Sequence, residues 1–302
     1  MKPPTWRDRC EYLGTRVFVA LSRRLPLRVV LALAWALGWL AFDVVRYRRR
    51  VALGNLERHL GAADGLPRGA RSSRAFRRLG RESVRTFITG LAEFARLPLL
   101  GEAWFQTRVS ACGLDHLDRA LEAGRGAVLV TGHFGSWEVT GKVLVRLGYP
   151  VKYLVGAQRN RLVLSLMNRI RLQCGIGVIE QHRLLAAVRA LKANQFVAML
   201  SDQDAGAGGV FVDFMGEPAS TPRGAARLAI LAGAPVIPGF IVTTGPGRHR
   251  VVIEPAIRPP GPADQDSVGD LTRAYTRVIE SYVRRYPGQW LWTHRRWKTR
   301  PS

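Results

Sequence analysis

The chain has 302 residues, of which 47% are hydrophobic, and it carries a formal net charge of +24. This length allows one large core, or a core with a small appendage. The charge predicts an anionic partner, namely nucleic acid, a phospholipid surface or a phosphorylated substrate. A mean hydropathy near zero excludes a polytopic membrane protein.

Three cysteines, Cys10, Cys112 and Cys174, lie far apart in the chain. Their number and spacing give neither a disulfide framework nor a metal-ligand pattern. The sequence also shows no signal peptide with a small-residue cleavage site. We therefore expect a protein of a reducing compartment.

The N-terminal region contains the apolar run VVLALAWALGWLAF at 29–42. A membrane span needs about 20 apolar residues, a length that this run reaches only when it is extended to 26–45. Trp35 and Trp39 share one face of the expected helix. Such a helix is either a buried core helix or one that dips into or crosses a bilayer, held by arginines on anionic headgroups.

The arginine-rich segment YRRRVALGNLERHL at 47–60 follows directly and favours the membrane interpretation. We therefore expect 1–50 to be a membrane-associating segment, with its hydrophobic helix at about 26–45. The remainder, 51–302, is expected to form the domain that carries the chemistry. The composition leaves open whether the helix spans the bilayer or only dips into it.

Beyond a predicted Gly-, Ala-, Ser- and Arg-rich loop at 61–75, short apolar runs alternate with helical stretches. This alternation predicts an α/β fold, a single domain with a central, largely parallel sheet flanked by helices. The predicted strands are 126–132, 151–156, 177–180, 196–200, 208–215, 235–242 and 249–255, and the predicted helices are 115–123, 136–147, 161–174, 182–193, 222–232 and 266–285.

Polar clusters follow two of the predicted strands, GHFGSWE at 132–138 and SDQDAG at 201–206. In open sheets of this kind, ligands bind beyond the carboxyl ends of the strands. The two clusters are therefore expected to face one crevice.

His133 and Glu138 stand out in the first cluster. A separation of five residues rotates by about 140° on an ideal helix, so the two side chains do not share a helical face. They can meet if His133 lies in a tight turn, which Gly132 and Gly135 permit, and Glu138 lies in the first turn of the next helix. Ser136 is the expected N-cap of that helix.

A carboxylate bonded to one imidazole nitrogen fixes the tautomer and raises the basicity of the other nitrogen. This chemistry indicates acyl transfer, in which His133 deprotonates an alcohol that attacks a thioester. An isolated H-x4-E also fits a structural histidine followed by a helix-capping glutamate. We expect no metal site, because the second histidine at i+4 and a third ligand are missing.

Longer motifs decide between these interpretations. Together with the H-x4-E pair, they identify the chain as resembling the bacterial lipid A biosynthesis acyltransferases, over nearly its whole length and in the same order. The three motifs are YRRRVALGNLERHL at 47–60, SDQDAGAGGVFVDFMGEPASTPRGAARLAILAGAPVIPGF at 201–240 and YPGQWLWTHRRWKTRP at 286–301.

The resemblance implies that 51–302 is an acyltransferase domain at the cell inner membrane, on its cytoplasmic side. It implies transfer of an acyl chain from acyl carrier protein to a hydroxyl of a phosphorylated glycolipid, the Kdo-bearing lipid A precursor of lipopolysaccharide synthesis, with no cofactor. The implied partners are acyl carrier protein, an anionic phospholipid membrane and the glycolipid acceptor, and not nucleic acid.

The resemblance also assigns residues. His133 and Glu138 match the catalytic pair, and Arg171 is implied to stabilise an oxyanion or bind phosphate, a role that Arg161 or Arg169 could also take. The residues implied to shape the substrate site are Asp202, Gln203 and Asp204 of the DQD motif, Arg223 at a helix start after Thr221-Pro222, and Arg295, with its neighbours His294 and Arg296, between Trp292 and Trp297.

Two other functions stay open at this point. One is acyl transfer to a different glycolipid or a lysophospholipid, such as a mannosylated phosphatidylinositol. The other is nucleic-acid binding, which predicts a basic stripe without a catalytic crevice. The acyl-chain length, the choice between acyl carrier protein and coenzyme A as donor, and the oligomeric state are not fixed by the sequence.

Overall fold

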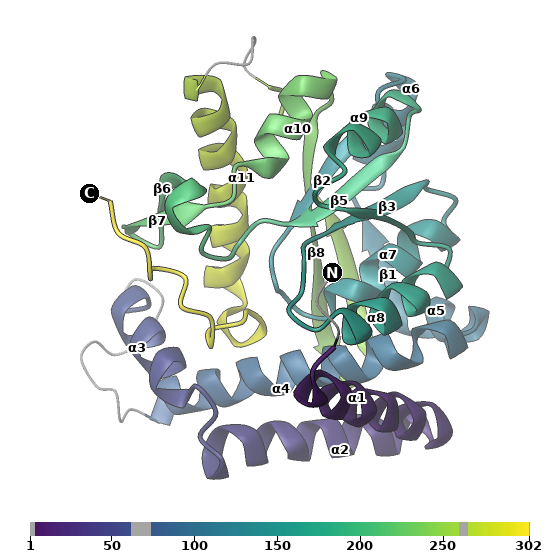
Figure 1. Cartoon of the computed structure of the whole chain (residues 1–302), viewed down its shortest axis with the longest axis vertical. Coiled ribbons are helices and arrows are strands. Elements are labelled where there is room, and N and C mark those ends of the chain that lie inside the picture. Colours follow the sequence, from purple (N-terminus) through teal and green to yellow (C-terminus); the bar gives the residue numbers. More distant parts are fainter. Residues whose placement is uncertain (1–3, 62–73, 260–264, 302) are drawn as a thin grey trace.

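The computed structural model describes residues 4–61, 74–259 and 265–301. Its central sheet is parallel except for one antiparallel pair, β8 with β9 (Figure 1). The strands follow the order β1 (Val109–Cys112), β9 (Arg248–Ile253), β8 (Val236–Gly245), β2 (Ala127–Thr131), β5 (Phe196–Leu200), β3 (Val151–Val155) and β4 (Gly177–Glu180). The predicted α/β class with a largely parallel sheet is confirmed.

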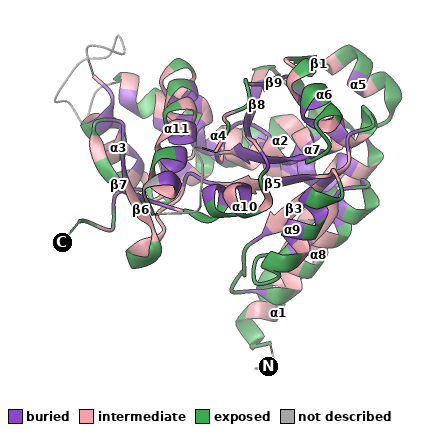
Figure 2. Cartoon of the chain, turned by 90° about the horizontal axis from the view of Figure 1, so that it is seen from above, coloured by how far each residue is buried: buried purple, intermediate pink, exposed green. Residues whose placement is uncertain are grey.

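Helices cover both faces of the central sheet. Its inner strands are largely buried (Figure 2). Along β2, Val128 and Val130 join one core, whereas Ala127 and Leu129 join the other. This alternation is the reason that the strand reads as a continuous apolar run. The first core contains α9 (Leu184–Lys192), α10 (Gly224–Ala232) and α11 (Gln265–Arg285), and the second contains α5 (Glu102–Arg108), α6 (Asp115–Glu122), α7 (Trp137–Arg146) and α8 (Arg161–Gln173).

From residue 115 onward, each predicted helix and strand is present with ends within three residues of those expected. The strand predicted at 208–215 lies outside the central sheet, because β6 (Val210–Phe214) pairs only with β7 (Glu217–Thr221) in the described residues. The sequence did not predict β7, whose EPAST segment is not an apolar run, or the mostly exposed edge strand β1. The loop predicted at 61–75 falls almost wholly outside the described residues.

The N-terminal helices form a layer at the edge of the molecule (Figure 1). There α1 (Trp6–Arg24) and α2 (Leu27–Trp39) pack on the long helix α4 (Arg74–Arg96), and α3 (Arg49–His59) contacts the first half of α4. A π-helical segment, η1 (Leu40–Val44), extends α2. The expected apolar helix at about 26–45 is therefore present.

One stripe of α2 is buried against α4. Val30, Ala34 and Gly38 lie at four-residue spacing on this stripe and are all buried. A Cβ atom on Gly38 would lie 2.7 Å from the Cα of Arg85, so the two helices touch backbone to backbone there. The contact fixes α2 alongside α4 over its length.

The opposite side of the α2 region is open. The stretch Leu27–Val44 is long and apolar enough to cross a membrane by length and composition, but only 22% of it is buried. Its exposed large hydrophobic side chains are Val29, Leu33, Trp35, Leu37, Trp39, Leu40 and Val44. The run is thus not a core helix in this fold.

The first and last of the three quoted motifs meet in space. The amide nitrogen of Asn55 on α3 donates to the carbonyls of Trp292 at 2.9 Å and of His294 at 2.8 Å. The ring of His59 stacks on Trp297 with centroids 3.5 Å apart. These contacts hold the C-terminal segment against α3.

Candidate active site

His133 and Asp202 come together because they follow neighbouring parallel strands. Thr131 of β2 pairs with Leu200 of β5, so each polar residue lies two positions beyond its strand. Nδ1 of His133 is 2.8 Å from Oδ1 of Asp202, and the backbone N–H of His133 donates to Oδ2 at 2.7 Å. The prediction that the two polar clusters face one crevice is confirmed.

The turn that carries His133 is built on glycine, as expected. A Cβ atom on Gly132 would lie 2.9 Å from Oδ2 of Asp202, and Gly135 adopts a φ of +55° beside the carbonyl of Ile241. A side chain at either position would displace the imidazole or strain the backbone.

A buried network of hydrogen bonds also holds the turn that carries His133. Ser136 occupies the N-cap position of α7, but its hydroxyl does not cap the helix as expected. It donates instead to Oε2 of Glu93 on α4 at 2.5 Å, and Oε1 of Glu93 lies 2.9 Å from Nε2 of His249 on β9. Glu93 and His249 are both buried, so the turn is tied to α4 and β9 through groups that water does not reach.

Asp202 is held as an ionised carboxylate. Its side chain is 2% exposed, and Oδ2 also accepts a hydrogen bond of 2.8 Å from the indole N–H of Trp290. Burial alone would raise the pKa of Asp202, but the charge and hydrogen bonds of His133 and the Trp290 bond outweigh it and lower the pKa to about 2. Asp202 therefore carries its negative charge throughout the neutral range.

The other imidazole nitrogen faces away from Asp202. Nε2 of His133 lies 3.3 Å from the amide nitrogen of Gln203. When Nδ1 carries the proton that Asp202 accepts, Nε2 is a hydrogen-bond acceptor, and the Gln203 amide stands where a donating hydroxyl would lie. The His133 side chain is 17% exposed, and Trp137 packs against it edge-on, with centroids 5.2 Å apart.

The sequence predicted a bond between Glu138 and His133, but the carboxylate of Glu138 is bonded to a different side chain. Glu138 lies in the first turn of α7, as expected, but its carboxylate forms a two-bond ion pair with Arg171 of α8, with Nε to Oε2 at 3.1 Å and Nη2 to Oε1 at 2.5 Å. The physical reason is that a helical turn carries the Glu138 side chain toward α8, whereas the sheet register brings Asp202 to the imidazole.

The sequence predicted that Arg171 stabilises an oxyanion or binds phosphate, but in the structure its guanidinium is bonded within the protein. Three of its five N–H groups are taken, two by Glu138 and one by Asn168 at 2.8 Å. Burial alone would lower the pKa of Arg171, but the Glu138 carboxylate more than offsets this and raises it. The alternatives named from the sequence, Arg161 and Arg169, are exposed on α8.

A cavity of about 400 Å³ opens beside the imidazole. Its polar lining side chains include His133, Glu138, Tyr153, Arg171 and Gln203. Apolar side chains make up most of the remaining lining, including Leu129, Trp137, Leu144, Val151, Leu154, Val155, Met199 and Leu200. The cavity therefore offers one basic nitrogen at a surface that suits a hydrocarbon chain.

The remaining residues expected in the substrate site lie outside this cavity. Asp204 accepts hydrogen bonds from the backbone N–H and hydroxyl of Thr299, at 3.1 and 3.0 Å, and so fastens the C-terminal segment. Arg223 is exposed at the N-cap of α10, between the lining residues Pro222 and Gly224. Arg295 is exposed on the C-terminal segment.

Two further residues near the site have partners that the sequence did not predict. Trp290 supplies a hydrogen bond to Asp202, and Arg296, not Arg295, is the buried arginine of the closing motif. Arg296 donates to the carbonyl of Ser220 at 2.5 Å and to the hydroxyl of Thr221, and burial lowers its pKa to about 10. The sequence signal for these contacts was the group of tryptophans and arginines at 290–297, because buried tryptophans commonly donate a hydrogen bond to a partner.

Comparison with known proteins identifies a family of related sequences. Residues 6–299 match the family described as "Bacterial lipid A biosynthesis acyltransferase". The chain is 30% identical over 282 residues to the "Lipid A biosynthesis palmitoleoyltransferase" of Escherichia coli, covering 92% of this chain and 88% of that protein.

Two further relatives are similar. The "Lipid A biosynthesis lauroyltransferase" of Escherichia coli is 27% identical over 292 residues, with 92% and 88% of the two chains covered. The "Phosphatidylinositol mannoside acyltransferase" of Mycolicibacterium smegmatis is 27% identical over 225 residues, with 72% and 71% covered. On the length and identity of these matches, the chain belongs to the bacterial lipid A biosynthesis acyltransferase family.

Proposed function

We propose that this enzyme transfers a fatty acyl chain from the thioester of acyl carrier protein to a hydroxyl of the Kdo-bearing lipid A precursor. The observation that carries the proposal is the placement of His133, with Nδ1 on an ionised carboxylate and Nε2 toward an apolar cavity. The names of the lipid A relatives support the acceptor class.

In the proposed reaction, Nε2 of His133 takes the proton from the acceptor hydroxyl as its oxygen attacks the thioester carbonyl. Asp202 stabilises the imidazolium that forms and keeps Nδ1–H in place. The tetrahedral intermediate then collapses, the carbon–sulfur bond breaks, and the imidazolium returns its proton to the leaving thiolate. The products are an ester and a free thiol, and the proposed reaction needs no cofactor.

The donor chain is assigned to the cavity beside His133, because its apolar lining suits a fatty acyl group. Acyl carrier protein is acidic, so the net charge of +24 favours it as the donor. In this account the buried pair of Glu138 and Arg171 shapes the cavity wall and does not take the proton.

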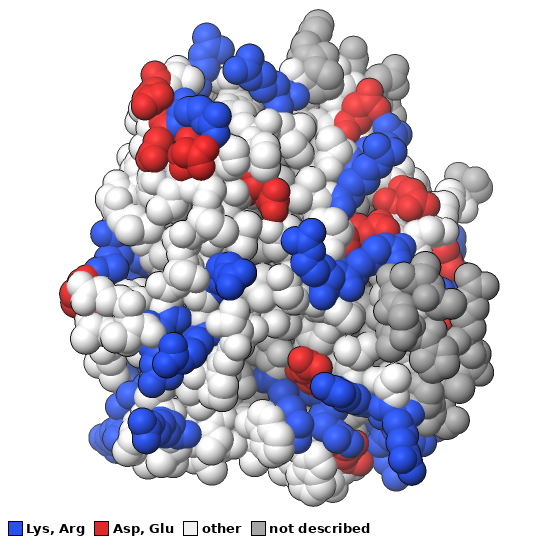
Figure 3. Space-filling model, turned by 180° about the vertical axis from the view of Figure 1, so that it is seen from behind, with Lys and Arg blue, Asp and Glu red and all other residues white. Residues whose placement is uncertain are grey.

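The proposed location is the cytoplasmic leaflet of the inner membrane, with 1–50 as the membrane-associating segment. Because α2 is packed along α4, its exposed apolar side lies parallel to that helix and is proposed to rest in the plane of the interface. Figure 3 shows Lys and Arg side chains gathered toward the lower part of one face, the end at which α2 lies in Figure 1. Arginines at this edge would meet anionic headgroups.

The test is acyl transfer by purified enzyme, with acyl-loaded acyl carrier protein and the lipid A precursor in vesicles. Wild-type enzyme is expected to form the acylated product, and His133→Ala to lose turnover while it still folds and binds anionic vesicles. Retained turnover in His133→Ala would refute the assignment of the base. Supplying the same acyl group on coenzyme A in a parallel reaction tests the donor.

A second acceptor is favoured by one observation, the similarity to a phosphatidylinositol mannoside acyltransferase over 72% of the chain. The same site chemistry would serve a hydroxyl of a mannosylated phosphatidylinositol. Presenting both lipids in one competition assay separates the two. Preference for the mannosylated lipid would overturn the lipid A assignment and leave the acyl-transfer mechanism standing.

A further inference from the structure

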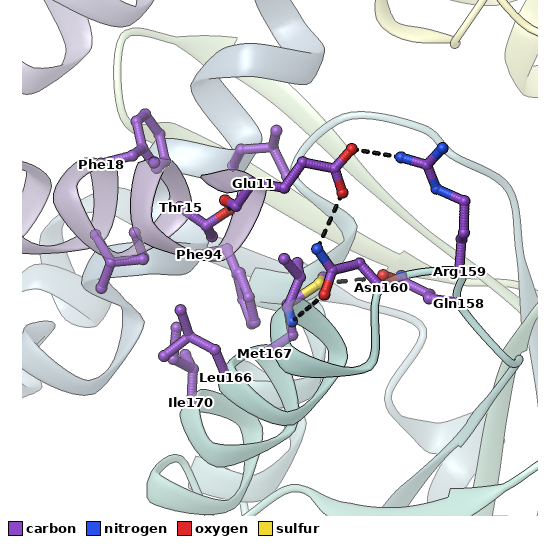
Figure 4. A pocket seen from close by; sticks show the side chains of 15 residues that line it. Glu11, Thr15, Phe18, Phe94, Gln158, Arg159, Asn160, Leu166, Met167 and Ile170 are labelled. Carbon is purple, nitrogen blue, oxygen red and sulfur yellow. Dashed lines mark hydrogen bonds and ion pairs between the residues drawn. The ribbon is translucent and has the colours of Figure 1, made fainter. Parts of the chain in front are cut away.

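A second cavity lies between α1, α4 and α8, on the N-terminal side of the molecule (Figure 4). Its volume is about 740 Å³, larger than that of the cavity beside His133. Its lining residues come from α1, from α4, from the 158–160 loop and from α8. The function proposed above makes no use of this cavity.

The cavity divides into an apolar interior and a polar mouth. Phe18, Leu91, Phe94, Leu166, Met167 and Ile170 line the interior, and Glu11, Gln158, Arg159 and Asn160 lie together at one end in Figure 4. A cavity with this lining favours a hydrocarbon chain that carries a polar group at one end.

The polar side chains at the mouth are bound to one another. Glu11 accepts hydrogen bonds from Arg159 and from the amide nitrogen of Asn160, the latter at 3.0 Å. The Asn160 side-chain oxygen caps α8 by accepting from the backbone N–H of Leu162 at 3.1 Å. These bonds join the start of α8 to α1 and hold the mouth in shape without filling the interior.

The cavity adjoins the proposed membrane face. The same helix that lines it, α1, exposes Leu13, Val17 and Leu21, each more than half accessible to solvent. Phe18, which lines the cavity, packs against the cluster of Val30, Ala34 and Ala92 between α2 and α4. The cavity therefore lies next to the helices whose exposed apolar side chains are proposed to meet the bilayer.

The cavity also adjoins the catalytic pocket. Gln158 lines both spaces. Between them stands the guanidinium of Arg171, which lies 5.7 Å from the ring centroid of Phe94, in the second cavity, and 5.7 Å from that of Tyr153, in the catalytic pocket. One lipid could thus place a reacting chain near His133 and another chain in the second cavity.

We propose that the cavity between α1 and α8 binds one non-reacting hydrocarbon chain of the acceptor lipid. The inference rests on the proposed function for the identity of that lipid. The donor chain has its own apolar space beside His133, and the acceptor comes from the bilayer that the exposed side of α1 would meet. The second cavity would therefore set the affinity for the acceptor and leave the chemical step unchanged.

Gly14 of α1 provides the variant for the test. Gly14 lines the cavity, and a Cβ atom built on it meets no atom within 4 Å, so a larger side chain enters the cavity without a clash. Gly14→Leu also improves helix propensity. Gly54 of α3 is the matched control, because its Cβ also meets no atom within 4 Å and it lines neither cavity.

In steady-state assays with the acceptor in vesicles, Gly14→Leu is expected to raise the acceptor KM about tenfold, the effect of displacing one or two buried methylene groups. Its kcat, its KM for the acyl donor and its vesicle binding should stay within twofold of wild type. Gly54→Leu should match wild type throughout. An unchanged acceptor KM, or a loss confined to kcat, would overturn the inference.

A labelling experiment separates this inference from the proposed function. Vesicles containing phosphatidylglycerol with a diazirine near the middle of one chain are irradiated with each variant, and labelled peptides are mapped. Wild type is expected to carry label on 11–19 and 160–170, and Gly14→Leu to lose most of it. Such loss would support a chain-binding cavity even if no acyl transfer were found. Equal labelling in both variants would refute it. If Gly14→Leu does not fold, Leu166→Trp fills the cavity from α8 with the same expectation.

Discussion

The imidazole of His133 and the carboxylate of Asp202 are 69 positions apart in the chain, and Nδ1 and Oδ1 lie 2.8 Å apart in the structure. The sheet produces this contact, because β2 and β5 are adjacent and parallel and both end at the same level. Glu138, which follows His133 by five residues, instead forms an ion pair with Arg171. The carboxylate that can support a basic imidazole is thus Asp202.

The lowered pKa of Asp202 predicts a stability change in acid. The pKa falls from 3.8 in a model peptide to about 2 in the folded protein, so the ionised group stabilises the fold above pH 4. This stabilisation, about 2 kcal/mol, is lost as the pH falls from about 4 to about 2. Denaturant unfolding of wild type and Asp202→Asn at several pH values measures it. The free-energy difference between the two should shrink in that window, and a constant difference would contradict the assignment.

His59 predicts a separate acid transition at higher pH. Burial lowers the pKa of His59 from 6.5 to about 4, where it stacks on Trp297. Its neutral form is favoured in the folded state, so stability is full above pH 6.5 and is lost as the pH falls toward 4, by about 2–3 kcal/mol.

His59→Phe keeps the stacking and removes the titration, so its unfolding free energy should not show this loss between pH 6.5 and 4. His182→Phe, at an exposed histidine, is the control and should behave as wild type. Equal acid sensitivity in wild type and His59→Phe would show that another group is responsible.

The buried Glu138–Arg171 pair predicts that removing one partner lowers the unfolding free energy and that removing the other as well restores it. Arg171→Met leaves a buried carboxylate without its partner and should cost about 3–5 kcal/mol of unfolding free energy. Adding Glu138→Leu removes the stranded charge and should recover most of that loss. Chemical denaturation of the single and double variants gives the coupling energy. If the double variant is no more stable than Arg171→Met, the two side chains do not act as a buried pair.

The exposed side of α2 predicts how the protein binds vesicles. Leu33 and Leu37 are 55% and 45% exposed there, and replacing either with Asp should weaken binding to anionic vesicles about tenfold or more. Leu185→Asp is the control, because Leu185 is 69% exposed on α9, outside the α1–α2 layer. Sedimentation with vesicles measures the affinities. Equal weakening by all three variants would place the membrane face elsewhere.

Much of the fold could be predicted from the sequence because its signals are local. The apolar runs at β2 and β5 are buried or half-buried on both faces, and the intervening helices follow helical periodicity. The crevice followed from the rule that parallel strands end at one edge. The apolar helix near the N-terminus was visible from composition, but its packing along α4 depends on small residues such as Gly38 meeting Arg85, a contact between distant segments.

The partners within the site could not be predicted in the same way. His133 and Glu138 are close in sequence, so the local pattern predicts them as a pair, whereas the contact with Asp202 depends on the strand order and register of the sheet. The indole of Trp290 reaches Asp202 from a segment 88 positions away. The motif marked Arg295 and Arg296 equally, and only the three-dimensional packing shows that Arg296 is the buried one.

The most direct test of the central claim is the kcat of Asp202→Asn in the acyl-transfer assay. The matched control is Asp204→Asn, because Asp204 is a neighbouring carboxylate that binds Thr299 outside the catalytic pocket. If Asp202 supports His133 as the base, Asp202→Asn should lower kcat by about 10³–10⁴-fold, as loss of the orienting carboxylate does in comparable sites, and Asp204→Asn should retain it within a few-fold. A kcat for Asp202→Asn close to that of wild type would contradict the account.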